Sequence, residues 1–269
     1  MSDEAITMDN RIEVVCLGSG TSHGVPMIGC DCAACVSTDP RDKRTRPAVA
    51  VTWGDRTFLV DTPPELRLQC VANGIDRCDA ILFTHHHADH VTGLDDVRRF
   101  NWLMGTELPC YGQAATLERV RGMFRYAFED DPDYPSHKPE LRLTPIDEAP
   151  LTLFGRTIIP IPLMHGPLPI FGYRFGRFAY CTDCNAIPER SLPLLEDLEV
   201  LILDGLRLRP HPTHFNLDQA VEMATRIGAR RTWFTHIAHE IKHEPINAGL
   251  PEGIELAYDG LRFSVGTGT

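Results

Sequence analysis

The sequence contains no uninterrupted apolar run of the ~18–20 residues that a helix needs to cross a bilayer, so no membrane partner is expected. It also lacks an excess of positive charge: 26 lysines and arginines face 37 aspartates and glutamates, which gives 26 − 37 = −11. A basic stripe is absent, and we expect no long nucleic acid as a partner. Residues 1–11, MSDEAITMDNR, lack the basic and then apolar pattern of a secretory signal, so we expect a cytoplasmic protein.

The composition, with 43% hydrophobic and 23% charged residues, is that of an ordinary globular protein. A chain of 269 residues can bury enough surface to fold without disulfides. The sequence shows no internal repeat, low-complexity tract or linker. We therefore expect a single domain, 1–269.

Short β-branched runs alternate with helical periodicity along the chain. The runs predict strands at 11–17, 48–53, 57–61, 80–85, 157–163, 171–175, 177–181, 200–204, 231–236 and 261–265. Periodicity of 3.6 residues predicts helices at 65–73, 94–104, 114–128 and 217–227. Hairpin turns at Gly54–Asp55 and Gly176 favour an α+β layered fold over a doubly wound parallel sheet.

The range 94–140 is a candidate lid over a substrate. Its last part, 129–140, reads EDDPDYPSHKPE and is acidic and rich in proline, which is typical of a surface excursion.

The segment from Thr84 to His90, THHHADH, follows an apolar strand-like run directly. Imidazole and carboxylate groups at this density suit Zn, Mn or Fe. His165, Asp183 and His236 follow other strand-like runs, so several strand ends can deliver ligands to one cleft.

This segment resembles the T-H-x-H-x-D-H signature of the metallo-β-lactamase-fold hydrolases, and the order of motifs matches from Val14 to Val265. The resemblance implies a four-layer αββα sandwich with two divalent ions, Mn or Zn, in the active site. Asp61 would orient the histidine loop, and His86 would not be a ligand. The resemblance implies one ion bound by His85, His87 and His165, a second bound by Asp89, His90 and His236, and Asp183 as the bridge between them.

Three cysteines, Cys30, Cys32 and Cys35, lie within the loop 29–35. In a chain without an export signal, this spacing predicts zinc rather than disulfides, and tetrahedral zinc needs a fourth ligand. His239 is the candidate and His243 the alternative. We expect one structural zinc here, remote from the chemistry.

A narrower resemblance is to the phosphoribosyl 1,2-cyclic phosphate phosphodiesterases of the carbon–phosphorus lyase pathway. It rests on the glycine-rich run 18–24, the cysteines that follow, and Thr235, His236 and His239. The run lacks the Lys-Ser/Thr ending of a P-loop and predicts a tight turn near the cleft wall. In the resembling group a histidine protonates the leaving alkoxide, and His214 matches its place better than His211.

The expected function is hydrolysis of a small phosphodiester, a ribose cyclic phosphate or a nucleotide-like molecule, by a metal-bridging hydroxide. Asp89 and His214 are the predicted catalytic residues. A small phosphorylated substrate or nucleotide is the expected partner, and a homodimer is a candidate assembly. The alternatives are a tRNA-processing endonuclease of the same fold, a thioesterase or lactamase, and a non-catalytic metal-binding protein.

Overall fold

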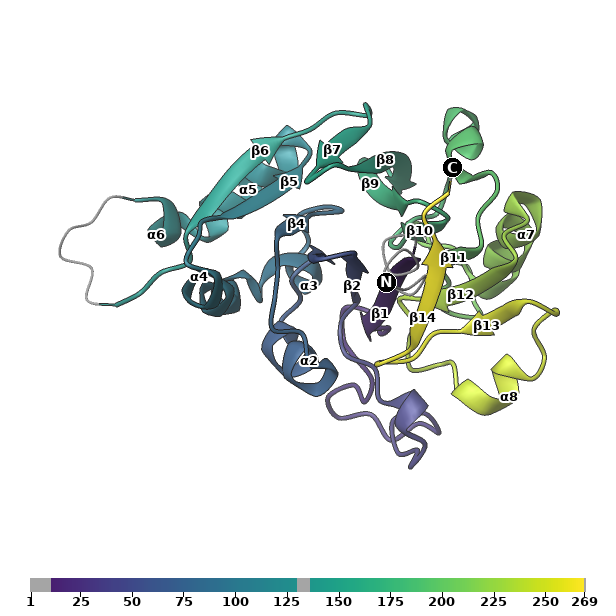
Figure 1. Ribbon diagram of the computed structural model, residues 1–269. Helices are drawn as coiled ribbons and strands as arrows, with labels where there is room; N and C mark the ends of the chain where they lie inside the picture. The colour runs from purple at the N-terminus through teal and green to yellow at the C-terminus, as the bar shows by residue number, and fades with distance from the viewer. Residues whose placement is uncertain (1–10, 130–135, 269) are drawn as a thin grey trace, which may run out of the picture.

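The computed structural model describes residues 11–129 and 136–268. Two sheets pack face to face in this part of the chain, and helices cover both outer faces (Figure 1). This arrangement confirms the expected four-layer α+β sandwich. No helix in the described ranges is both long and apolar enough to cross a membrane.

The first sheet is built mainly from the N-terminal half of the chain. It combines antiparallel strands on one side with parallel strands on the other. Its strand order is β14 (Arg262–Gly266), β1 (Arg11–Gly18), β2 (Ala48–Trp53), β3 (Arg56–Val60), β4 (Ala80–Leu82), β5 (Leu108–Gly112) and β6 (Leu141–Pro145).

The second sheet repeats this mixed arrangement. Its strand order is β13 (Ile254–Leu256), β12 (Arg231–Thr235), β11 (Val200–Asp204), β10 (Phe178–Cys181), β9 (Leu168–Phe175), β8 (Arg156–His165) and β7 (Leu151–Leu153). The predicted turns at Gly54–Asp55 and Gly176 connect antiparallel neighbours in the two sheets.

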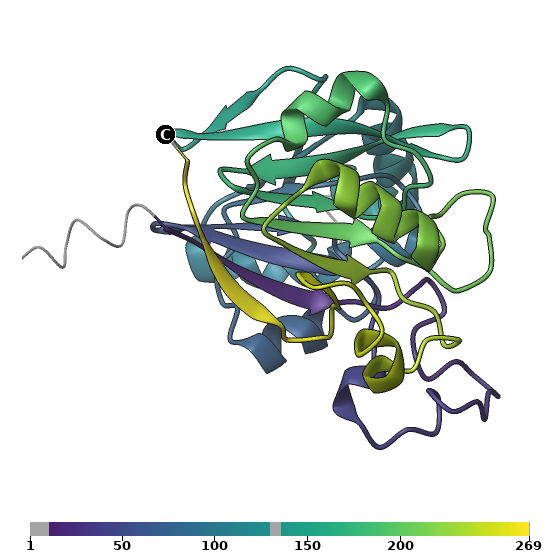
Figure 2. The same cartoon turned by 90° about the vertical axis from the view of Figure 1, so that its right-hand side faces the viewer.

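Apolar faces of the helices cover the outer side of each sheet. The first sheet is covered by α2 (Leu66–Asn73), α4 (Arg98–Met104) and α5 (Ala114–Met123), and the second by η4 (Glu189–Leu195) and α7 (Leu217–Ile227). Figure 2 shows α7 lying across its sheet. The short elements are η2 (Pro40–Asp42), α3 (Ala88–Val91), η3 (Leu94–Val97), α6 (Arg125–Phe128) and α8 (His243–Asn247).

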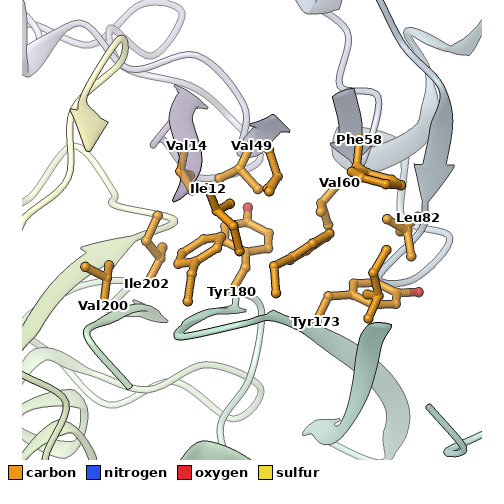
Figure 3. Packing of buried hydrophobic residues seen from close by; sticks show 14 of the residues in the cluster. Ile12, Val14, Val49, Phe58, Val60, Leu82, Tyr173, Tyr180, Val200 and Ile202 are labelled. Carbon is orange, nitrogen blue, oxygen red and sulfur yellow. The ribbon is translucent and has the colours of Figure 1, made fainter. Parts of the chain in front are cut away.

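The central core lies between the sheets. Figure 3 shows aliphatic and aromatic side chains of the first sheet facing Tyr173, Tyr180, Val200 and Ile202 of the second. The Tyr173 hydroxyl donates to the Phe83 carbonyl at 2.8 Å, and the Phe171 N–H donates to the Thr84 carbonyl at 3.1 Å. These bonds join the sheets directly beside the histidine segment.

Several element boundaries differ from the expectation. The predicted strand 80–85 ends at Leu82, and the predicted helix 114–128 is interrupted at Phe124, whose φ and ψ are −110° and 37°. The strands β5, β6, β7 and β13 were not predicted, because β5 and β6 contain proline and β7 and β13 are only three residues long.

The range 94–140 includes β5, which lies between β4 and β6 in the first sheet, together with α4 and α5. These elements are part of the layered fold. Part of the predicted surface excursion, 130–135, lies outside the described residues, and a closing movement of 94–140 stays a prediction.

Candidate metal centre

The predicted ligands gather where central strands of both sheets end. The histidine segment follows β4 in the first sheet, and His165 is the last residue of β8 in the second. Asp183 follows β10, and His236 follows β12. Asp61, Asp183 and His236 have positive φ angles of 67°, 57° and 61°. Non-glycine residues seldom adopt this left-handed conformation, which tends to persist at sites whose surroundings fix it.

All seven residues predicted to bind the two ions come together, in two groups that share Asp183. His85, His87, His165 and Asp183 form the first group, and Asp89, His90, Asp183 and His236 form the second. In each group the candidate ligand atoms lie within 4.8 Å of one another. His86 belongs to neither group.

The two carboxylate oxygens of Asp183 face different groups. Oδ2 lies 3.6 Å from Nε2 of His85, and Oδ1 lies 3.2 Å from Nε2 of both His90 and His236. Oδ2 of Asp89 lies 3.5 Å from the same two nitrogens of His90 and His236. Asp183 therefore occupies the position of a bridge between two cation sites.

Buried polar atoms without a hydrogen-bond partner point to a cation. Among the described residues they include Nε2 of His85, His90 and His236. A buried nitrogen left unpaired costs roughly 1–3 kcal/mol, and three such atoms facing the same carboxylates need an explanation. A divalent ion bound by these nitrogens would explain them, so the residues fit a metal ion.

Neighbouring oxygens fix the orientation of three of the histidine rings. Nδ1 of His90 lies 2.7 Å from Oδ2 of Asp61, which also accepts from the Thr84 hydroxyl at 2.8 Å. Nδ1 of His85 lies 3.0 Å from the Thr84 hydroxyl, and Nδ1 of His165 lies 3.0 Å from the Thr213 carbonyl. Each ring therefore presents Nε2 to the site, which is the usual outer-shell support of histidine ligands.

The electrostatics of the site also favour a cation. Burial lowers the pKa of His165 to about 4 and that of His85 well below the ordinary histidine value, so both rings are neutral ligands. Burial opposes a charge on His90, yet the carboxylates of Asp183, Asp89 and Asp61 raise its pKa well above that value. In this dry environment those carboxylates require positive charge, which a metal ion can supply.

His214 lies beside the first and second groups and is held by a residue that the sequence reasoning missed. Its ring stacks on His236 with centroids 4.6 Å apart, and its Nδ1 lies 3.1 Å from Oδ1 of Asp204. Asp204 is the last residue of β11 and accepts from the backbone N–H groups of Asp183 and Phe215. The sequence did contain a signal for Asp204: it follows the apolar run VLIL directly, as Asp61 follows TFLV.

The three cysteines of the loop 29–35 form a separate cluster with His239. Nδ1 of His239 lies 3.2 Å from Sγ of Cys30 and 3.3 Å from Sγ of Cys32. Cys35 completes a group whose ligand atoms lie within 4.8 Å of one another. His243, the alternative fourth ligand, is buried elsewhere and packs against Tyr258. Figure 2 shows the cysteine-bearing segment beside α8.

The cysteine cluster borders a cavity that His214 also lines, and its expected remoteness from the chemistry stays a prediction. His239 and His214 line the same cavity of about 330 Å³. His239 lies three residues after His236, and the segment between them is hydrogen-bonded to the glycine-rich run. The Thr21 N–H donates to the Ile237 carbonyl at 3.1 Å. Thr21 also lines the cavity, so the run forms part of its wall. The predicted tight turn is present, because the Gly24 N–H donates to the Thr21 carbonyl at 2.7 Å.

Close backbone packing explains the glycines of this wall. A Cβ at Gly18 would lie 2.0 Å from the Arg46 carbonyl oxygen, and one at Gly20 would lie 2.7 Å from the Arg44 carbonyl oxygen. Neither position can hold a larger residue without displacing the neighbouring backbone.

Known proteins similar to this chain include the following three. The chain is 43% identical to the structure titled "Crystal Structure of a New Diphosphatase from the PhnP Family", with a TM-score of 0.90 and coverage of 96% of this chain and 99% of that one. It is 38% identical to an octanoyltransferase of Porphyromonas gingivalis over 92% of this chain, and it spans about half (50%) of that relative's length. It is 28% identical to a ribonuclease Z of Mycolicibacterium gilvum over 84% of both chains.

The family model of the beta-lactamase superfamily domain matches residues 56–237, from β3 to the residue after His236. This range contains the whole histidine and aspartate constellation described above. The chain therefore belongs to the beta-lactamase superfamily and has the metallo-β-lactamase fold.

Proposed function

We propose that this protein is a hydrolase that cleaves small phosphodiesters, such as ribose cyclic phosphates or nucleotide-like diesters, at a site for two divalent ions. The observation that carries the proposal is the placement of Asp183, whose two oxygens face two separate sets of nitrogen ligands. The 43% identical structure described as a diphosphatase supports hydrolysis at phosphorus.

The assignment of ligands follows the two groups. His85, His87 and His165 would hold one ion, Asp89, His90 and His236 would hold the other, and Asp183 would bridge them. Manganese or zinc suits this mixture of imidazole and carboxylate. Such a pair, when bound, lowers the pKa of water and neutralises charge on the phosphate oxygens.

His214 is suited to give a proton to the leaving oxygen. Both oxygens of Asp204 accept hydrogen bonds from backbone N–H groups, so Asp204 acts as an acceptor. We therefore assign its contact with His214 as a hydrogen bond donated by Nδ1 of His214. Nε2 then remains as the nitrogen that can face the substrate. Donation from Nε2 requires the doubly protonated ring. Burial lowers the pKa of His214, so this form releases its Nε2 proton readily and is lost as the pH rises.

We propose that the cysteine cluster with His239 binds one structural zinc. Three sulfurs and one ring nitrogen form a complete tetrahedral set, which leaves no open coordination position for a substrate. The cluster would fix the turn 236–239 and through it one side of the cavity.

A tRNA-processing endonuclease is the second candidate, because ribonuclease Z relatives match most of the chain. The net charge of −11 opposes it, since an acidic protein gains little from counterion release on a long RNA. Octanoyl transfer is not proposed, because that name belongs to a protein of which this chain spans about half.

The test compares kcat/KM for adenosine 2′,3′-cyclic phosphate and for a structured precursor tRNA at moderate salt, with Mn²⁺ or Zn²⁺ bound. Faster turnover of the cyclic phosphate is expected. Faster cleavage of the precursor tRNA would instead establish the endonuclease. Full binding of both ions with no turnover of either substrate, or of bis(p-nitrophenyl) phosphate, would support the non-catalytic alternative.

A further inference from the structure

His236 lacks the support that other ligand rings of the metal centre receive. Its Nδ1 is buried and has no hydrogen-bond partner in the described part of the chain. Three other ligand rings have an oxygen at Nδ1, namely those of His85, His90 and His165. The direction of the His236 ring therefore depends on its stacking against His214 and on the backbone that carries it.

The backbone of His236 adopts a conformation that needs support. Its φ angle is 61°, in the left-handed region that non-glycine residues seldom occupy. The next residue, Ile237, is held by the glycine-rich run 18–24 at both of its backbone groups. Its N–H donates to the Ser19 carbonyl at 2.9 Å, and its carbonyl accepts from the Thr21 N–H at 3.1 Å. A strained backbone persists only where its surroundings fix it, so the glycine-rich run supports His236.

Asp259 in turn holds the glycine-rich run. Its Oδ1 accepts from the Ser19 N–H at 2.9 Å and from the Ser19 hydroxyl at 2.8 Å. Its Oδ2 accepts from the Thr45 N–H at 2.7 Å and from the Thr45 hydroxyl at 2.6 Å. The Thr45 carbonyl accepts from the Gly20 N–H at 2.8 Å, so both oxygens of Asp259 act on the run. Hydrogen bonds to an ionised carboxylate are the stronger kind, and four of them fix the run firmly.

The position of Asp259 is fixed by its connections to both sheets. The residue lies between β13 of the second sheet and β14 of the first. Two residues before it, the Ala257 N–H donates to the Phe234 carbonyl of β12 at 2.8 Å. One residue after it, the Gly260 N–H donates to the Cys16 carbonyl of β1 at 2.8 Å. The carboxylate is therefore held in place relative to β12, the strand that ends directly before His236.

We infer that Asp259 is a positioning residue for the metal ligand His236, and that it sets the affinity of the second group of ligands for its ion. The contacts run from Asp259 through Ser19 and Ile237 to His236. No hydrogen bond among the described residues joins the glycine-rich run to His85, His87 or His165, so the first group should not respond. The inference rests on the two-ion site of the proposed function and is independent of the substrate.

The experiment measures Mn²⁺ binding by calorimetry in protein depleted of active-site metal. Mn²⁺ prefers oxygen and imidazole ligands to thiolates, so it does not report on the cysteine cluster. Asp259→Asn can accept on one side only, and the bonds from either Ser19 or Thr45 are lost. The second Mn²⁺ should bind about 10-fold or more weakly, as is typical of changes behind a ligand, while the affinity of the first is retained. Electron paramagnetic resonance should then show less of the spin-coupled Mn²⁺ pair and more free Mn²⁺.

Asp79→Asn is the matched control. Asp79 also accepts on both oxygens, from the Arg56 guanidinium at 2.8 Å and from the Thr57 N–H at 2.9 Å. It precedes β4, at the opposite end of that strand from the histidine segment. The control should lose stability yet retain both Mn²⁺ affinities. Ser19→Ala removes one of the four bonds to Asp259 and should weaken the second ion to a smaller extent, which tests the same contact if Asp259→Asn folds poorly.

Three results would overturn the role of Asp259: unchanged affinity for the second ion in Asp259→Asn and Ser19→Ala, equal weakening of both ions, or the same weakening in Asp79→Asn. Two Mn²⁺ ions bound by the wild type without any diester turnover would refute only the proposed substrate. A single ion bound by the wild type would refute the two-ion centre, and Asp259 would keep its role only if Asp259→Asn weakened that ion.

Discussion

Oδ1 of Asp204 lies 3.1 Å from Nδ1 of His214 and 3.0 Å from the backbone nitrogen of Asp183. One carboxylate oxygen thus fixes both the ring proposed to protonate the leaving group and the backbone of the proposed bridging ligand. Burial raises the pKa of Asp204 well above the ordinary aspartate value, which opposes a charge on it. Its contacts with three nitrogen atoms are what allow it to serve as an acceptor.

Replacing His214 should affect poor leaving groups most. His214→Ala should lower kcat/KM about 100-fold or more for diesters with an alkoxide leaving group, the size of a typical general-acid contribution. Bis(p-nitrophenyl) phosphate, whose leaving group needs no proton, should lose less than about 10-fold. Equal losses for both substrates would show that His214 acts in binding rather than in proton transfer.

Asp204→Asn tests the positioning role of the carboxylate. The amide cannot accept as strongly from Nδ1, so the rate with alkoxide leaving groups should fall by about 10-fold or more while both metal ions remain bound. The pH profile of kcat should shift along with the rate. A variant that retained the wild-type pH profile would contradict the assigned hydrogen bond.

Asp183→Ala should abolish the dinuclear site. The proposed bridge disappears, so at least one ion should be lost and turnover of bis(p-nitrophenyl) phosphate should fall by about 1,000-fold or more. Metal analysis of the purified protein provides the direct measurement. Asp55→Ala, at an exposed turn between β2 and β3, is the matched control and should retain both ions. Full metal content in Asp183→Ala would refute the bridge.

Cys32→Ser should remove the structural zinc and disturb the cavity. A decrease of ~2 kcal/mol in the free energy of unfolding would lower the Tm of a chain of this length by about 4–8 °C. Because His239 lines the cavity with His214, KM should rise more than kcat falls, and the pH dependence should stay unchanged. Retention of one zinc ion beyond the active-site pair with an unchanged Tm would contradict the assignment.

The metal-depleted cysteine cluster should react selectively. Burial acts to raise the pKa of Cys32, but hydrogen bonds from the Cys35 backbone and the His239 ring lower it to about 6. For Cys35, burial raises the pKa to about 11. A lowered pKa means that the Cys32 thiolate forms above about pH 6 and is lost below it. Iodoacetamide at pH 7 should therefore modify Cys32 before Cys35, as peptide mapping by mass spectrometry can show, and zinc should protect both.

Local patterns predicted most of the strands and helices and the polar residues at strand ends, whereas the four-layer sandwich and the assignment of the ligands were implied by the resemblance to the metallo-β-lactamase-fold hydrolases. A strand that ends in Asp or His identifies itself in sequence, and parallel neighbours bring such ends to one edge. The short strands β5, β6, β7 and β13 are recognisable only through their neighbours in the sheets. Sheet pairing, rather than local propensity, determines such elements.

The residues that were missed act through contacts between distant segments. Asp204 was visible as a strand end, but its importance depends on His214, Asp183 and Phe215 converging on one carboxylate. The proximity of the cysteine cluster to the cavity depends on how the turn 236–239 packs against Thr21. Neither set of contacts can be predicted from the spacing of residues along the sequence.

The ligands are divided between the two sheets, and this division affects unfolding as well as catalysis. His85 and His87 follow β4 of the first sheet, and His165 ends β8 of the second. A bound ion would therefore cross-link two halves that otherwise meet through side-chain packing and a few hydrogen bonds. Such a cross-link closes a long chain loop and binds only the folded state. Separation of the sheets should therefore depend on free metal concentration, and a chelator should decouple the unfolding of the two halves.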